Sequence, residues 1–331
     1  MSDSSLLLTG LNAQNPLAFF AALGLLNVLD DYARSRHEPR PWLSFVDEGQ
    51  TSQLGTSLSL DDVIAVVIAD ARSPSIDPVL TFAYSDAGER VAPKSKRARR
   101  DLKPSSDLAR EFLLACSTDN RRIADLAAGL FSELVQDNNG STKPTALHFT
   151  AGQQEFLRMV QDLRAGLTED TLREALLGPW LNVSALPSLS WDSSATRNYA
   201  LRARNPSSEK RGSVPAADWL GVQSLAFFPV FAQRRRLATT CVVGGWKDSA
   251  LTWPTWRTRL AVPVVASLLR VDIGHMTATE RAAAGVEAVF SVRILRSDQG
   301  GYGSFSPADV VLPRVRDRAI RQDRRPREQH A

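Results

Sequence analysis

The chain of 331 residues has few of the residues that build metal centres and covalent cross-links. Its two cysteines, Cys116 and Cys241, are far apart and form neither a disulfide framework nor a zinc motif. Its four histidines are scattered. The glycine-rich phosphate loops, the zinc-protease helix motif and the nucleophile elbow of common enzyme classes are also missing. We therefore expect no metal, no cofactor and no catalytic activity.

The longest apolar stretch, NPLAFFAALGLLNVLDDYARS at 15–35, is shorter than a membrane span requires. Its apolar core ends at Leu29 and is followed directly by two aspartates, whereas a transmembrane helix needs about 20 apolar residues. The residues before it carry no positive charge of the kind that begins a signal peptide. Asn15 suits the N-cap of a helix and Pro16 its first turn. The stretch predicts a buried helix at 16–34 in a cytoplasmic protein without membrane contact.

The rest of the sequence mixes helical and strand patterns without a regular βαβ rhythm, which predicts an α+β fold of helices and short sheets. We expect two closely packed domains, 1–138 and 146–313, divided at the polar segment 136–145, and a basic disordered tail at 314–331. Strands are predicted at 5–10, 42–47, 79–84, 146–150, 237–243 and 287–295, and helices at 59–72, 106–116, 121–136, 151–167, 168–178, 215–228, 262–270 and 277–285.

Positive charge is modest in total but clustered along the chain. The net charge is +4 and the pI about 9.3. KSKRARR at 94–100 has five cations, QRRR at 233–236 adds three, and the tail at 314–327 has seven arginines against two aspartates. Such clusters suit a phosphate backbone, because each neutralised phosphate releases condensed counterions. Solvated loops and a solvated tail are the alternative, but three clusters together favour a polyanionic partner.

The region 191–231 interleaves aromatic residues with arginines and lysines. Aromatic faces and cations together are typical of a surface that stacks bases and follows phosphates. The alternative is that the aromatics are core residues and the cations are solvated. The aromatic residues are Trp191, Tyr199, Trp219, Phe227 and Phe228. The candidate nucleic-acid-binding residues of the whole chain are Lys94, Lys96, Arg97, Arg99, Arg100, Arg197, Tyr199, Arg202, Arg204, Lys210, Arg211, Arg234, Arg235 and Arg236.

Other residues of types that occur in catalytic or nucleotide-binding sites are explained by structural roles. His148 lies in the apolar run ALHFT, where a hydrogen-bonded buried histidine is expected. Asp61 and Asp62 stand where they would cap a helix. The glycine-rich DQGGYGSF at 298–305 lacks the lysine of a nucleotide loop and reads as a turn. A metal-dependent nuclease remains an alternative, and Asp192 is the first residue that we would test for it.

Four segments together resemble a known family. They are LTGLNAQNPLAFFAALGLLNVL at 8–29, LHFTAGQQEFLRMV at 147–160, WDSSATRNYAL at 191–201 and ADWLGVQSLAFFP at 217–229. In this order they resemble subunits encoded in type I-G (formerly I-U) CRISPR loci, which are assigned as the large subunit of the effector or as a companion of the helicase-nuclease. The resemblance spans roughly residues 5 to 312 and carries no catalytic signature.

The resemblance implies a non-catalytic binding role in an antiviral effector complex. In such complexes the guide RNA reads sequence by base pairing, and the protein subunits hold backbones and a short flanking duplex. The expected partners are guide RNA or target DNA and other effector subunits, including the helicase-nuclease. The alternative is a structural adaptor that binds only protein, with Trp246, Trp253 and Trp256 as interface anchors.

Overall fold

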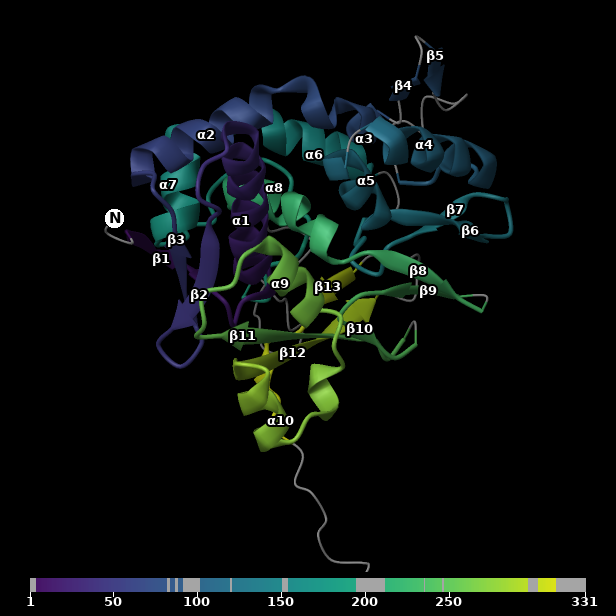
Figure 1. Ribbon diagram of the computed structural model, residues 1–331. Helices are drawn as coiled ribbons and strands as arrows, with labels where there is room; N and C mark the ends of the chain where they lie inside the picture. The colour runs from purple at the N-terminus through teal and green to yellow at the C-terminus, as the bar shows by residue number, and fades with distance from the viewer. Residues whose placement is uncertain are drawn as a thin grey trace, which may run out of the picture.

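Helix α1 is the buried helix expected near the start of the chain, and the other elements surround it (Figure 1). The computed structural model describes residues 4–81, 84–86, 89–91, 102–119, 121–150, 154–194, 212–234, 236–245, 247–296 and 303–313. The helices and antiparallel sheets confirm the predicted α+β class. The elements in chain order are β1 (Ser5–Asn12), α1 (Pro16–Arg36), β2 (Trp42–Val46), β3 (Thr51–Gly55), α2 (Leu60–Arg72), η1 (Pro74–Ile76), α3 (Asp77–Thr81), β4 (Tyr84–Asp86), β5 (Glu89–Val91), α4 (Ser106–Asp119), α5 (Arg121–Ala128), β6 (Phe131–Gln136), β7 (Thr142–Pro144), α6 (Phe156–Ala165), α7 (Glu169–Leu177), α8 (Pro215–Gln223), η4 (Ser224–Phe227), β8 (Val230–Gln233), β9 (Arg236–Thr239), β10 (Val242–Val243), β11 (Ala250–Trp256), α9 (Val262–Leu268), η5 (Ile273–His275), α10 (Ala278–Ala283), β12 (Val286–Arg296), β13 (Gly303–Phe305) and β14 (Asp309–Val310).

Local signals at both ends define α1. The side chain of Asn15 accepts a hydrogen bond from the backbone N–H of Leu17 at 3.1 Å, which satisfies a donor of the first turn. The helix ends at His37, whose φ of 57° lies in the left-handed region. Within the described residues, α1 is the one helix long and apolar enough to cross a membrane, and 83% of its apolar window is buried inside the protein. The prediction of a core helix is confirmed.

Helix α8 packs so closely on α1 that a glycine is required between them. A Cβ atom on Gly24 would lie 1.7 Å from the carbonyl oxygen of Leu220. Further along α1, the side-chain amide of Asn27 donates to the carbonyl of Gln223 at 3.3 Å. Because α1 comes from the first predicted domain and α8 from the second, this contact joins the two halves of the chain.

Two antiparallel sheets adjoin α1. One has the strand order β1-β3-β2; the other has the order β10-β11-β12-β13, with β14 also paired to β12. Leu43 of β2 and Leu260 exchange backbone hydrogen bonds of 2.9 and 3.0 Å. The indole N–H of Trp256 on β11 donates to the carbonyl of Leu43 at 2.8 Å. The small sheet is thus tied to the larger one, which we call the main sheet.

The core between α1 and the main sheet is rich in aromatic rings. The ring of Phe19 lies 5.8 Å from Trp253 and 6.0 Å from Phe45, and Phe20 lies 5.5 Å from Trp191, measured between centroids. Such pairs contribute beyond the burial of their surface. Buried residues before 138 and after 146 belong to one hydrophobic cluster in the described part of the chain.

Three predictions of secondary structure, at 121–136, 79–84 and 146–150, differ from the structure. The helix predicted at 121–136 ends at Ala128, and β6 follows it; Gly129 lets the backbone pass Leu225, whose carbonyl oxygen would lie 2.1 Å from a Cβ at this position. The polar segment 136–145 turns the β6–β7 hairpin. The strand predicted at 79–84 is helical through Thr81, and 146–150 is irregular rather than extended.

Candidate nucleic-acid interface

The predicted basic cluster at 233–236 forms the tip of a two-stranded hairpin, β8–β9. The strands pair from Val230 with Thr239 to Gln233 with Arg236, leaving a two-residue tip. Arg234, the first tip residue, has a φ of 59°, the left-handed conformation that two-residue hairpin turns require. Arg234 and Arg236 are both exposed. The hairpin projects from the body of the molecule beside β6 and β7 (Figure 1).

The base of the hairpin is fixed by hydrogen bonds. The backbone N–H and the hydroxyl of Thr240 both donate to the carbonyl of Pro229, at 3.2 and 2.8 Å. The hydroxyl oxygen of Thr239 accepts from the backbone N–H of Ala146 at 3.0 Å. The hairpin that carries the arginines is therefore short and is held at its base by these hydrogen bonds.

One face of the hairpin combines an aromatic ring with a cation. Directly paired residues of an antiparallel ladder point to the same face, and alternate residues of a strand share a face. Phe231, Gln233 and Arg236 accordingly lie on one face, and all three are exposed, Phe231 by 53%. A guanidinium can bind a phosphate while a nearby ring contacts a base. The hairpin therefore brings one exposed aromatic ring and one exposed guanidinium to the same face.

The hairpin arginines differ from the arginine at the centre of the helical region. Neither Arg234 nor Arg236 makes a side-chain hydrogen bond or ion pair within the described part of the chain. The buried Arg122 instead binds both oxygens of Asp70 at 2.5 and 2.7 Å and lies 3.5 Å from Asp31. Burial alone would lower the pKa of Arg122, but its bonds and charge interactions with these acids outweigh burial and raise it. Arg122 is committed to the fold; the hairpin arginines are available to a ligand.

Most of the other predicted binding residues lie outside the described part of the chain. They are Lys94, Lys96, Arg97, Arg99, Arg100, Arg197, Tyr199, Arg202, Arg204, Lys210, Arg211 and Arg235. The described residues that follow the 94–100 cluster lie at the β6–β7 hairpin, where the carbonyl of Pro104 accepts from the N–H of Thr142 at 2.9 Å. β6 also packs against β8, so the β6–β7 and β8–β9 hairpins adjoin one another.

Of the two interpretations of the aromatic residues in 191–231, burial in the core is confirmed for four. Trp191, Trp219, Phe227 and Phe228 are at most 2% exposed and belong to the core. Two of the tryptophans expected as protein-interface anchors are also unavailable. Trp253 and Trp256 are fully buried, and their indole N–H groups donate to the carbonyls of Ala13 and Leu43. Trp246 lies outside the described residues.

Asp192, the residue singled out for a nuclease, is one of two buried aspartates at the start of α1. One oxygen of Asp192 accepts from Asn15 Nδ2 at 2.7 Å and from the N–H and hydroxyl of Ser194. Asp218 accepts from the N–H of Leu189 at 3.1 Å, and the other oxygen of each acid is buried without a hydrogen-bond partner among the described residues. Burial raises the pKa of Asp218 to about 8; the Leu189 hydrogen bond opposes this and the charge of Asp192 adds to it. Asp192 thus holds the capping residue Asn15 in place.

Two other expectations about polar residues are confirmed. His148 is buried, and its Nε2 lies 2.7 Å from the hydroxyl oxygen of Thr150. Ser59 and Asp62 form a capping box at the start of α2, as expected for that aspartate. Among the described residues, no three His, Cys, Asp or Glu side chains lie close enough together to hold a metal ion.

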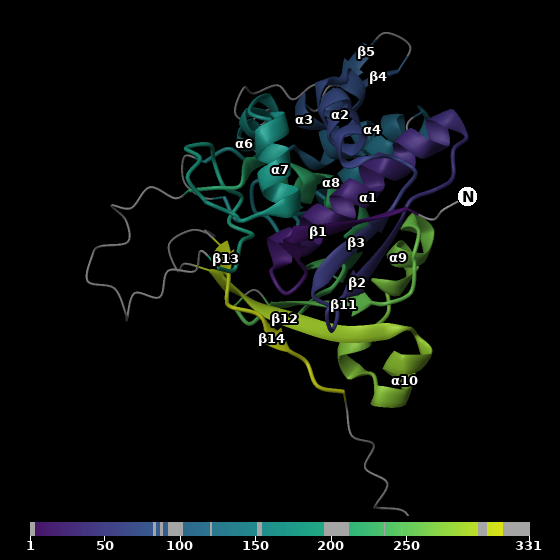
Figure 2. The same cartoon turned by 90° about the vertical axis from the view of Figure 1, so that its left-hand side faces the viewer.

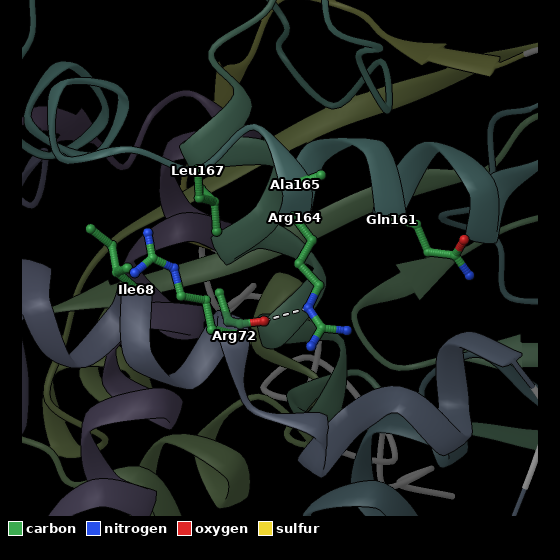
Figure 3. Close-up of a pocket in the computed structure, with 7 residues that line it drawn as sticks. Ile68, Arg72, Gln161, Arg164, Ala165 and Leu167 are labelled. Carbon is green, nitrogen blue, oxygen red and sulfur yellow. Dashed lines mark hydrogen bonds between the residues drawn. The ribbon is translucent and has the colours of Figure 1, made fainter.

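The surface hollows of the helical region are lined by arginines already used by the fold. In a depression of about 340 Å³ between α2 and α6, the guanidinium of Arg164 donates to the carbonyl of Ala71 (Figure 3). It also donates to the carbonyl of Ser73 and to Asp77. It thereby caps the end of α2. A larger groove of about 670 Å³ between α1 and α2 is lined in part by Arg122 and Asp70, which neutralise one another. Neither hollow presents an unpaired buried cation to a ligand.

The structure also shows two exposed residues that the sequence predictions omitted, Phe231 on β8 and Arg293 on β12. The alternation of VFSVRIL at 289–295 contained a signal for the second, since Arg293 stands between two apolar residues of a predicted strand. Comparison of the chain with protein-family models, with curated proteins and with solved structures gave no match.

Proposed function

We propose that the protein is a nucleic-acid-binding subunit of a type I CRISPR antiviral effector complex and has no catalytic activity of its own. The observation that carries the proposal is the β8–β9 hairpin, which presents Arg234 and Arg236 without acidic partners among the described residues and Phe231 on the face of Arg236. The sequence resemblance to type I-G subunits supports the effector context. Its partners would be guide RNA or target DNA and the other subunits, including the helicase-nuclease.

The chemistry of the hairpin suits a phosphate backbone better than a protein partner. Arginine forms paired hydrogen bonds with phosphate oxygens and stays charged at any physiological pH. Arg234 and Arg236 lie close together at the exposed end of a narrow hairpin, and this concentration of positive charge favours a ligand that is itself densely charged. The clusters at 94–100 and 197–211 would add further backbone contacts in the assembled complex.

Charge reversal of the hairpin tests the proposal. The double variant Arg234→Glu, Arg236→Glu should bind labelled single-stranded DNA, duplex DNA or RNA more weakly than the unchanged protein. If each arginine contacts one phosphate, the slope of log K against log salt should fall by about two. Fluorescence anisotropy across a salt series measures both effects. Extending the reversal to Arg97, Arg99 and Arg100 applies the same test to the 94–100 cluster.

The matched control reverses two exposed arginines on the helical side of the molecule, Arg72 and Arg158 on α2 and α6. It changes the net charge by the same amount, so only local contacts distinguish the two variants. Equal loss of binding in both would mean that the hairpin acts only through net charge. Absence of salt-dependent binding by the unchanged protein to all three nucleic acids would refute the proposed function.

A further inference from the structure

The two faces of the main sheet have different surroundings. Along β12, the side chains of Phe290, Val292 and Ile294 point inward and are at most 2% exposed. The alternation of a strand puts Arg293 and Leu295 on the opposite, outer face, where Arg293 is exposed and Leu295 is 39% exposed. The inner face thus contributes to the core, and the outer face is a separate surface.

Within the described part of the chain, elements pack on one end of this outer face. α10 packs on β12 and η5 packs on β11, and Val289 at that end of β12 is buried. A hydrogen bond of 3.0 Å between the hydroxyls of Thr252 and Ser291 marks the limit of the covered end. Figure 2 shows β12 passing below α1 with α10 under one end of the strand. No other described helix or strand packs on the other end, from Ser291 to Leu295, which we call the open end.

The register of the strands defines the composition of the open end. Val243 pairs with Ala250, and Ala250 pairs with Arg293, so the three side chains lie in a row across β10, β11 and β12. In the next row, Leu295 pairs with Ser304 of β13. Val243 is 53% exposed. The open end therefore presents the small side chains of Ala250 and Ser304 and one cation, Arg293. The exposed apolar side chains of Val243 and Leu295 lie on either side of Arg293.

Arg293 differs from its neighbour Arg296 on the same strand. Arg296 faces inward, and its guanidinium donates to the carbonyls of Ala146 and His148; desolvation lowers its pKa to about 10. The guanidinium of Arg293 forms no hydrogen bond or ion pair within the described part of the chain. Asp309, which the register puts on the outer face opposite Ser291, lies at the boundary with the covered end and forms no ion pair with Arg293. The open end is positively charged at its centre.

We propose that the open end of the outer face holds a single strand of nucleic acid, with Arg293 on a phosphate and Val243 and Leu295 against the neighbouring bases. This inference rests on the proposed function and names the form of nucleic acid bound. A single strand exposes its bases to apolar side chains, whereas a duplex stacks them inside and offers a flat protein face mainly phosphates. The chain runs from β9 directly into β10, so the base of the arginine-tipped hairpin adjoins the open end of the sheet.

Arg293→Ala provides the test. The variant should bind labelled single-stranded DNA or RNA several-fold more weakly at physiological salt, with the salt slope lowered by about 0.7, the value for one phosphate of a single strand. Its affinity for a duplex of the same sequence should stay within twofold. The matched control, Arg72→Ala, removes an exposed arginine of α2 and should change neither affinity. Equal melting temperatures would show that both variants are folded.

The possible outcomes separate this inference from the proposed function. If the unchanged protein binds no nucleic acid, both fail. If it binds single strands and the hairpin variant weakens that binding while Arg293→Ala does not, the proposed function stands and the inference is wrong. Equal weakening of single-strand and duplex binding by Arg293→Ala would overturn the assignment to a single strand. Selective loss of single-strand binding supports it.

Discussion

The interior around α1 and the outer surface of the main sheet and hairpin use arginine in opposite ways. In the interior, Arg122 is bound by Asp70, and Arg296 is bound by backbone carbonyls. On the outside, Arg236 and Arg293 are exposed and have no acidic partner within the described residues. The number of cations in a region therefore says little about whether it binds an anion. A guanidinium can bind a ligand only if acids or carbonyls of the fold do not already occupy it.

The largest expected effect comes from placing a charge in the interior. Leu23→Asp puts a carboxylate at a fully buried position of α1, where an unpaired charge is strongly disfavoured. We expect the variant not to fold. The same change at Leu114, which is 64% exposed on α4, should leave the fold intact. Circular dichroism and thermal unfolding measure both; cooperative melting of Leu23→Asp at the normal temperature would mean that α1 is not the core helix.

Removal of a committed arginine should have the next largest effect. Arg122→Ala leaves Asp70 and Asp31 without their buried partner, and breaking a buried pair in this way costs about 3–5 kcal/mol. The adjacent Arg121, whose side chain is 78% exposed and pairs with Asp125, serves as the control, because an exposed pair contributes little. Urea denaturation gives both free energies of unfolding. Similar values for the two alanine variants would contradict the contrast between buried and exposed arginines.

A further expected effect concerns the pH dependence of stability. The pKa of Asp218 is about 8 in the fold against 3.8 as its ordinary value, so the folded state binds the proton more tightly. Its stabilising contribution is fully present below about pH 4 and is lost as pH rises toward about 8, at about 1.4 kcal/mol per pH unit. Asp218→Asn should remove this slope from the free energy of unfolding.

The control for this pH series is Asp248→Asn, at an exposed position of the β10–β11 loop. It should keep the slope of the unchanged protein between pH 5 and pH 8. Urea denaturation at several pH values measures all three proteins. Retention of the full slope by Asp218→Asn would assign the titration to a different group.

The parts of the fold that were predicted correctly depend on local signals. Asn15 and Pro16 begin α1, and a Ser–Asp capping box begins α2; each acts within a few residues of the helix end. The helix predicted at 121–136 was wrong in its second half because a distant contact decides its end: the backbone at Gly129 passes close to Leu225. A contact between residues so far apart in the chain cannot be predicted from a single sequence.

The candidate nucleic-acid interface was likewise predicted only where the signal is local in the sequence. Consecutive arginines were visible as a charge cluster, and the structure places Arg234 and Arg236 at an exposed tip. Composition could not tell which way the aromatic residues point, so Trp191 and Trp219 were taken as possible stacking residues although both are buried. The face that Arg293 shares with Val243 depends on the register of three strands, which only the folded chain defines.

The closed base of the β8–β9 hairpin has a consequence for how this protein can change during evolution. Because Thr240 and Pro229 fasten the two strands together beside the body of the protein, insertions, deletions and substitutions between them need not disturb the packing around α1. Related chains would therefore be expected to differ in the length and charge of this arm while keeping the helix pair beneath it, so that ligand preference diverges faster than architecture.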